Sequence, residues 1–463
     1  MQTSARRSGS STDGSGAASP SQRRKAVVSS FLGNFVEWFD YGAYSYLAVT
    51  IGHVFFPGDI RNSTFMAFAL FAVSFLIRPF GAVFWGYWGD KLGRTKALAW
   101  SIIIMTGCTV LIGCLPGAGA IGLAAPIALL ILRLGQGFSA AGEYAGASAL
   151  LTEFAPRQRR GMFAAVVPAS TSSGLLLGSL FATALYGLLD EAAMASWGWR
   201  IPFLVAGPMG LVGLYIRRKV EDTPAFKAHT TRQMAVVRQG QQKPPSPTLV
   251  LFRDHAKELL QGFGIVLLNA VGFYVVLTFM PTYLSENLGY DAGASQFATT
   301  LSLVTYIAFI FMTGFIADRI GRRMTLILAS ATFIVLSLPA FWLMSTGHYW
   351  LAVLALVLMG AFLSLNDGAM PSAVSELYPT AVRFSGFALV FNIGNALFGG
   401  PMSAVNTWLI DSTGNTLWPA YILIGAAVLS LIAVLTSKDR SRQDIDYPDP
   451  AADPAVDPRT DAA

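Results

Sequence analysis

Ionisable side chains interrupt otherwise apolar stretches in the first half of the sequence. They are three acids and two bases, namely Glu37, Asp40, Glu143, Arg78 and Arg133. A charge in the middle of a membrane helix costs roughly 2.5–3.5 kcal/mol on insertion scales, so these charges must face one another or a wet cavity. Because the acids outnumber the bases by one, one carboxyl lacks a cation, and a low-dielectric site favours its neutral form. The sequence therefore predicts a proton carrier among these acids.

Depth along the helices limits which of these charges can pair. At 1.5 Å per residue, Arg78 and Glu143 both lie roughly 15–18 Å from the predicted cytoplasmic ends of their helices. The same measure lets Arg133 approach Asp40. The sequence therefore predicts the pairs Arg78–Glu143 and Arg133–Asp40, which serve either coupling or the structural joining of helices.

One face of the first apolar segment is aromatic and polar. Asn34, Trp38 and Tyr41 share this face at helical spacing, and Tyr44 lies beside the stripe. Such a face next to carboxylates can hold a cationic group through cation–π contacts, although ordinary helix packing produces the same pattern. Together with polar positions elsewhere, the candidates for solute binding are Asn34, Trp38, Tyr41, Tyr44, Arg78, Arg133, Gln136, Tyr144, Asn269, Tyr274, Asn366, Asn392 and Asn395.

Asp367 is an acidic residue of the second half with no evident cationic partner inside the apolar segments of that half. An ionisable residue within a membrane is by default a candidate functional residue. The candidates for proton coupling are therefore Glu37, Asp40, Glu143 and Asp367.

The elements that carry these residues are long apolar segments. Hydrophobic residues make up 54% of the 463-residue chain and charged residues only 13%, against about 25% in soluble domains. A membrane-spanning helix needs about 20 apolar residues. The segments that qualify are 27–55, 63–88, 97–115, 124–151, 161–188, 199–217, 258–284, 293–316, 324–344, 349–374, 384–410 and 416–436. The sequence therefore predicts an all-α membrane protein with about twelve transmembrane helices in a lipid bilayer.

Lysine and arginine gather in alternate cytoplasmic connections, among which Arg217, Arg218 and Lys219 are counted at the end of the sixth segment. By the positive-inside rule both termini are predicted to be cytoplasmic, and the chain is predicted to lie in the cell inner membrane. Two six-helix bundles are predicted over 26–217 and 258–436, joined by a central cytoplasmic loop at 218–257. The tails, 1–25 and 437–463, are rich in small, polar or charged residues and are predicted to be disordered.

A glycine- and charge-rich loop occurs once in each half. Its two copies contain Gly86, Asp90 and Arg94, then Gly314, Asp318 and Arg322. The glycines let another helix approach closely, and each aspartate lies at a helix end where an arginine can pair with it. A single copy is equally well a charged turn that sets topology. Two copies at equivalent positions favour a cytoplasmic gate that latches in one conformation.

This loop pair is the signature of the major facilitator superfamily, and further stretches make the resemblance specific. The chain resembles the metabolite–proton symporter family, nearest its proline/betaine branch, over residues 33–41, 78–81, 136–144, 197–203, 221–226 and 392–400. The resemblance implies uptake of a small polar metabolite together with protons. Internal repeats of this kind place the solute near mid-membrane, between the halves.

The branch favours a zwitterionic osmolyte such as proline or betaine as the solute. The alternative is an organic acid of the 2-oxoglutarate, citrate or shikimate type, whose carboxylate Arg78 or Arg133 would clamp. The best-known members of the branch carry a long C-terminal coiled coil, whereas residues after 437 show no heptads here. Osmotic activation of the same kind is therefore not predicted.

Other classes of function find little support in the residues. The four histidines and two cysteines show no metal-ligand spacing, and no phosphate-cradling loop of the Walker type is present. The chain is therefore predicted to be no enzyme, to need no cofactor or metal, and to bind no nucleic acid. A uniporter and a non-transporting membrane sensor remain as alternatives, although neither terminus offers an output module for a sensor.

Overall fold

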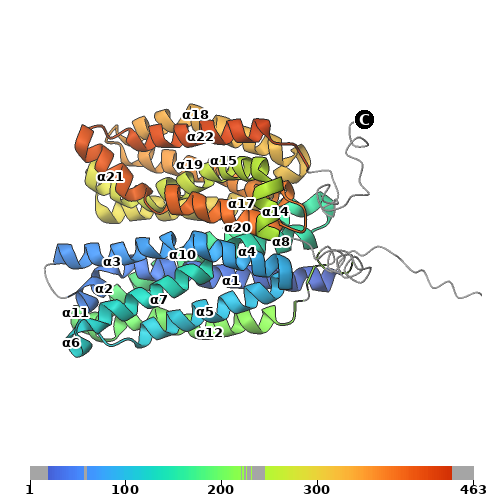
Figure 1. The fold of residues 1–463 in the computed structure, drawn as a ribbon. Helices are drawn as coiled ribbons and strands as arrows, with labels where there is room; N and C mark the ends of the chain where they lie inside the picture. Colours follow the sequence, from blue (N-terminus) through green and yellow to red (C-terminus); the bar gives the residue numbers. More distant parts are fainter. Residues whose placement is uncertain are drawn as a thin grey trace, which may run out of the picture.

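The computed structural model describes residues 19–56, 60–220, 222–223, 226, 231 and 246–440. These residues are almost entirely helical, and none of them lies in a strand. The helices run roughly parallel to one long axis and form two stacked bundles (Figure 1). The predicted all-α fold class is therefore confirmed.

The first bundle starts with a helix whose N-terminus is capped by the side chain of Ser19, with a reciprocal bond from Gln22. Its helices are α1 (Pro20–Tyr46), α2 (Ala48–Phe55), α3 (Ile60–Leu76), α4 (Arg78–Leu92), α5 (Arg94–Cys114), α6 (Ala118–Ile121), α7 (Ala124–Ala140), α8 (Glu143–Phe154), α9 (Arg160–Ala164), α10 (Val166–Leu188), α11 (Glu191–Ser196) and α12 (Ile201–Arg217).

The second bundle contains three π-helical segments, Phe273–Phe279, Tyr283–Asn287 and Asn395–Gly399. Its α-helices are α14 (Pro247–Asp254), α15 (Ala256–Gly272), α16 (Met280–Thr282), α17 (Ala292–Ile320), α18 (Arg322–Met344), α19 (Tyr349–Leu377), α20 (Arg383–Gly394), α21 (Met402–Thr413) and α22 (Trp418–Thr436). Such π segments break the regular hydrogen-bond ladder of a helix and occur frequently at functional sites.

Eleven helical stretches of the described chain are long and apolar enough to cross a membrane. The predicted twelfth is α1, whose 27 residues are long enough but include buried polar and charged side chains. The predicted segment 63–88 is two helices, α3 and α4, because Pro79 has no N–H to continue the ladder and so begins a new helix after Ile77.

The turn between paired helices depends on glycine in both copies of the repeated loop. Gly93 and Gly321 have φ of 111° and 97°, a region that residues with a side chain rarely adopt. Gly93 ends α4 and Gly321 ends α17, so each loop reverses the chain within one residue.

The ends of the chain differ in part from the prediction of disorder. Helix α1 begins at Pro20, so 20–25 is helical, while residues 1–18 and 441–463 lie outside the described residues. Residues 437–440 pack against the second bundle: the guanidinium of Arg440 donates to the carbonyl of Leu377 at 2.7 Å. Within the predicted central loop, α14 is a short helix.

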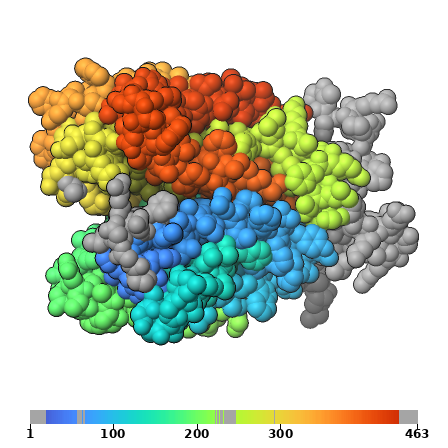
Figure 2. All heavy atoms as spheres, turned by 60° about the vertical axis from the view of Figure 1, so that its left-hand side comes forward, coloured from blue at the N-terminus to red at the C-terminus, as the bar shows by residue number. Residues whose placement is uncertain are grey.

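The two bundles meet along a seam that runs through the middle of the molecule. Figure 2 shows the blue-to-green half on one side of this seam and the yellow-green-to-red half on the other. Contacts across the seam join α4 and α8 to α20, and α9 and α10 to α17.

Candidate functional site

A cavity of about 260 Å³ lies between the halves, at the middle of the long helices. The first half contributes Trp38 from α1, Tyr144 from α8, and two residues of α10. The complete lining is Trp38, Tyr144, Pro168, Thr171, Asn269, Phe273, Tyr306, Asp367, Phe391 and Asn395. Five of the predicted residues, counting Asp367, are therefore brought together in one cavity, as internal repeats predicted.

Asp367 is the charged side chain of this cavity and is fully buried on α19. It accepts hydrogen bonds from the amides of Asn269 and Asn366 at 2.8 and 2.9 Å, and from the hydroxyl of Tyr306 at 2.6 Å. No lysine or arginine of the described residues forms an ion pair with it. The sequence had predicted a carboxyl without a cation here.

Aromatic rings form much of the remaining wall. The rings of Trp38 and Phe273 meet edge to face at 5.3 Å, and those of Tyr144 and Phe391 stack at 4.0 Å between centroids. In the described structure, the indole nitrogen of Trp38 and the hydroxyl of Tyr144 are buried without a hydrogen-bond partner. Buried polar groups are normally satisfied, so these two groups are free to bind a solute.

The three acids predicted within the apolar segments of the first half, Glu37, Asp40 and Glu143, each form an ion pair. Arg133 contacts Asp40 at 3.4 Å, which confirms that predicted pair. The prediction for Arg78 was wrong, because its guanidinium lies 3.1 Å from Glu37. Glu143 instead pairs with Arg217, a residue that the sequence analysis assigned to a cytoplasmic loop.

Arg217 is fully buried at the end of α12 and reaches back into the bundle. It donates to both carboxylate oxygens of Glu143 at 2.6 and 2.9 Å, and to the carbonyls of Leu98 and Ser29. Three acids within the apolar segments therefore face three bases, and the prediction that one of these acids lacks a cation was wrong.

The three acids differ in how fully their oxygens are occupied. Both oxygens of Glu143 accept hydrogen bonds, including one from Ser101 at 3.1 Å. By contrast, Oε2 of Glu37 and Oδ1 of Asp40 have no partner among the described residues. An oxygen without a donor is open to a proton, which favours Glu37 and Asp40 over Glu143 as proton carriers.

The ion pair of Glu143 and Arg217 requires a glycine on α1. A side chain at Gly33 would overlap both the Glu143 carboxylate and the Arg217 guanidinium. We therefore expect Gly33→Ala to lower the free energy of unfolding by about 3–5 kcal/mol, as when a buried pair is broken. Gly107→Ala on α5 is the matched control, because nothing lies within 4 Å of its added methyl group. Thermal unfolding in detergent measures both, and equal melting temperatures would contradict the packing described.

The predicted gate residue Asp90 contacts the opposite half of the molecule. Its carboxylate accepts from the backbone N–H groups of Phe384 and Ser385, at 3.1 and 2.8 Å, at the first turn of α20. A carboxylate at a helix N-terminus is favoured by the helix dipole. Gly86 lets the helices meet, since a Cβ there would lie 2.7 Å from Ser385 Cα. Arg94 lies 3.6 Å from Asp90.

The second copy of the loop makes the reciprocal contact. Asp318 accepts from the backbone N–H groups of Gly161 and Met162, at 2.8 and 2.9 Å, at the start of α9. It also pairs with Arg322 at 2.9 Å. A Cβ at Gly314 would lie 2.9 Å from that of Ala165. Each half thus holds a helix start of the other half.

Two glutamates extend these contacts, and the sequence analysis did not place them in the site. Glu153 bonds Arg94, Arg383 and the hydroxyl of Thr223, so it joins both halves to the central loop. Glu376 contacts Arg160 of the first half at 3.2 Å and Arg322 at 3.6 Å. Their signal was present in the sequence, because each glutamate is followed three residues later by a proline at equivalent places of the two halves, in 153–156 and 376–379.

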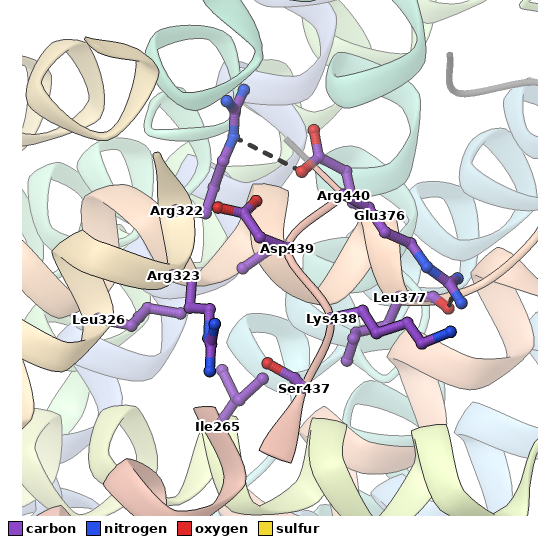
Figure 3. A pocket seen from close by; sticks show the side chains of 11 residues that line it. Ile265, Arg322, Arg323, Leu326, Glu376, Leu377, Ser437, Lys438, Asp439 and Arg440 are labelled. Carbon is purple, nitrogen blue, oxygen red and sulfur yellow. Dashed lines mark hydrogen bonds and ion pairs between the residues drawn. The ribbon is translucent and has the colours of Figure 1, made fainter. Parts of the chain in front are cut away.

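A second cavity lies beside Glu376 at the same end of the molecule. Figure 3 shows its lining, with the ion pair of Arg322 and Glu376 at the top and the segment Ser437–Arg440 running up to it. Arg323 donates to the carbonyl of Leu435 in the last turn of α22 at 2.7 Å, just before this segment. The first residues after α22 therefore lie beside the gate residue Arg322.

Several predicted solute ligands have other contacts. Asn34 binds α10 through Val167, Ser170 and Thr171, and Asn392 donates to the carbonyl of Ala141. Arg133 stacks on Tyr44 at 3.4 Å, and Arg78 lies over Tyr41 at 4.8 Å. The amide of Gln136 donates to Asp40 at 2.8 Å, and the ring of Tyr274 meets Phe75. None of these predicted ligands, namely Asn34, Tyr41, Tyr44, Arg78, Arg133, Gln136, Tyr274 and Asn392, lines the cavity.

Tyr306 is a cavity residue that sequence reasoning missed. It lies on α17, twelve positions before Asp318, just as Arg78 lies twelve positions before Asp90. The repeat therefore assigns Tyr306 to the place that Arg78 occupies in the first half, and this correspondence could have identified it.

Comparisons with known proteins agree with this geometry. Residues 25–438 match the family model described as sugar (and other) transporter. The proline/betaine transporter of Escherichia coli K12 is 38% identical over 434 residues, which are 93% of this chain and 86% of that protein. The glycine betaine/proline/ectoine/pipecolic acid transporter OusA of Dickeya dadantii matches with the same identity and coverage.

Solved structures with the same fold are those of a sugar symporter. The proton:xylose symporter XylE of the major facilitator superfamily, bound to 6-bromo-6-deoxy-D-glucose, aligns with a TM-score of 0.74 over 92% of this chain and 98% of that one. A partially occluded inward-open form of XylE from E. coli aligns with a TM-score of 0.64 over 90% and 97%. Sequence identity is 15% in both, so the likeness concerns the fold.

Proposed function

Because this chain belongs to the sugar (and other) transporter family of the major facilitator superfamily, we propose that it imports a zwitterionic osmolyte, such as proline or betaine, together with protons. The observation that carries the proposal is the cavity between the halves, closed at one end by the reciprocal contacts of Asp90 and Asp318. Such a cavity is the part that alternating access requires.

The gate contacts hold the halves together at the end where α1 begins and α22 ends, which we take as the cytoplasmic end in the inner membrane. Breaking them would open the cavity to the cytoplasm, while the solute would enter from the other side. Each aspartate bonds two neighbouring backbone N–H groups at one helix start, so both bonds would break together when the halves separate. The halves would then rock about the solute as two bodies.

Coupling to protons is assigned to the first half, where Glu37 and Asp40 each have one oxygen without a partner. A proton on either acid weakens its ion pair with Arg78 or Arg133. The arginine can keep its other hydrogen bonds. Arg133, for example, donates to the side-chain oxygen of Gln136 at 2.9 Å. Protonation thereby changes the packing of α1 against its neighbours.

The nature of the solute is supported by the relatives, whose printed solutes are proline, betaine, ectoine and pipecolic acid. These compounds combine a positively charged nitrogen, or its amidinium equivalent, with a carboxylate. An organic acid is disfavoured by the cavity, because Arg78 and Arg133 are committed to acids and do not line it.

Uptake by proteoliposomes that contain the purified protein tests the proposal. Labelled proline, betaine and 2-oxoglutarate are compared with and without an inward proton gradient. We expect the gradient to drive accumulation of betaine or proline above the outside concentration, with no accumulation of 2-oxoglutarate. Gradient-independent uptake would indicate a uniporter, a preference for the dicarboxylate would overturn the solute class, and no uptake of any solute would favour a sensor.

A further inference from the structure

One buried carboxylate of the described chain stands apart from the others. Glu37, Asp40, Asp90, Glu143, Glu153 and Glu376 each form an ion pair with at least one arginine. Asp367, which has no exposed surface, is bonded to two amides and a hydroxyl instead. A buried charge is costly unless it is paired, and no lysine or arginine of the described residues pairs with Asp367, so a positive group bound in the cavity would stabilise its charged form.

The three donors fix the direction of this carboxylate. Asn269 on α15 and Asn366 bond Oδ1, while Tyr306 on α17 bonds Oδ2. The carboxylate is the acceptor in all three bonds. The donors and the acceptor together come from three helices of the second half, α15, α17 and α19. Asp367 is therefore held rigidly at the cavity wall, as a ligand for a positive group should be.

The surroundings of Asp367 suit an alkylated nitrogen. Phe273 and Phe391 of the second half and the rings of Trp38 and Tyr144 line the same cavity. A desolvated cation gains attraction from aromatic faces, and such rings are the usual partners of quaternary ammonium groups. An inorganic cation would require further oxygen ligands, whereas the alkyl groups of a substituted ammonium would fill the space between these rings.

The first half contributes hydrogen-bond donors to the cavity, whereas the second half contributes the carboxylate of Asp367. The Trp38 indole N–H is a donor and the Tyr144 hydroxyl can donate, and neither has a partner among the described residues. They lie on α1 and α8, across the seam from α19. A zwitterion would therefore place its nitrogen against the second half and its carboxylate against the first.

We infer that Asp367 is the subsite for the positively charged nitrogen of the solute, and that it selects zwitterions against anions. The inference rests on the proposed transport function and names the residue that sets its specificity. It also separates two tasks, because Asp367 binds the nitrogen while Glu37 and Asp40 remain the acids for the proton. A solute held at both ends would draw the halves together as the cavity closes.

A pair of isosteres tests the inference. Betaine is trimethylammonioacetate, and 3,3-dimethylbutyrate has the same shape and carboxylate with a carbon in place of the charged nitrogen. Calorimetric titration of the detergent-solubilised full chain gives the dissociation constant of each. We expect wild type to bind betaine tighter on the order of 100-fold, as for a desolvated charge pair. In Asp367→Asn the ratio should fall to about threefold or less, and Asp367→Glu should restore most of it.

The outcomes separate the inference from the function. Equal affinity of wild type for the two isosteres would overturn the inference without any variant being needed. So would a wild-type ratio that persists in Asp367→Asn, and in either case betaine uptake would leave the proposed function standing. Wild type that neither binds nor transports betaine or proline would overturn both.

Discussion

Asp40→Asn will abolish proton-driven accumulation of the solute while leaving solute exchange across the membrane intact. The amide cannot take up and release a proton. In Asp40, Oδ1 has no partner among the described residues, and Oδ2 forms a loose pair with Arg133 at 3.4 Å. The hydrogen bond from Gln136 at 2.8 Å can persist to the amide oxygen, so the fold should be kept. Uptake by vesicles with and without an inward proton gradient measures accumulation, and loading them with unlabelled solute measures exchange.

Glu143→Gln is the matched comparison, because Glu143 has both oxygens bonded to Arg217. This change replaces two close charge-assisted bonds from Arg217, at 2.6 and 2.9 Å, whereas the Asp40 pair is a single contact of 3.4 Å, so we expect Glu143→Gln to lower the free energy of unfolding more, by about 3–5 kcal/mol. Accumulation by Asp40→Asn at the wild-type level would remove Asp40 as the carrier and transfer the role to Glu37.

Asp90→Ala will shift the resting protein towards the form that is open at the cytoplasmic end. The change removes two charge-assisted hydrogen bonds to the start of α20 that exist only while the halves are closed there. A loss of about 2 kcal/mol corresponds to about a 30-fold shift in the equilibrium. Spin labels on the exposed residues Gln158 and Lys438, one in each half, report the separation after Cys108 and Cys114 are replaced.

Asp254→Ala provides the control for this experiment. Asp254 lies in the same part of the chain and pairs with Arg253 at 2.8 Å, but that pair is on the surface of α14 and is worth little. Asp318→Ala should reproduce the effect of Asp90→Ala, because its contacts with α9 are reciprocal. Unchanged label distances in both aspartate variants would show that these contacts do not set the resting state.

The helices and the gate could be predicted from the sequence because each leaves a local signal. Apolar length predicted the spanning segments, and the duplicated loop predicted Gly86, Asp90, Gly314 and Asp318 as points of contact. The partner of each aspartate could not be predicted, because a backbone N–H at a helix start carries no residue-specific signature. Each aspartate therefore bonds the start of a helix of the opposite half in addition to its neighbouring arginine.

The charges inside the bundle were harder to assign, because pairing depends on rotation about helix axes as well as on depth. Arg78 and Glu143 lie at similar depths, yet Arg78 meets Glu37. Arg217 was counted with the loop that follows it, although its long side chain extends back to Glu143. That Asp367 has no ion pair among the described residues could be predicted for a simpler reason: no lysine or arginine of its half lies within the apolar segments.

The most direct test of proton-coupled symport is to measure proton movement that is driven by the solute alone. Vesicles that contain the protein and a trapped pH-sensitive dye start with equal pH on both sides, and betaine is then added outside. We predict that the lumen acidifies as betaine enters through the wild-type protein, and that Asp40→Asn takes up betaine without acidification. Entry of betaine through the wild-type protein with no change in lumenal pH would contradict proton-coupled symport.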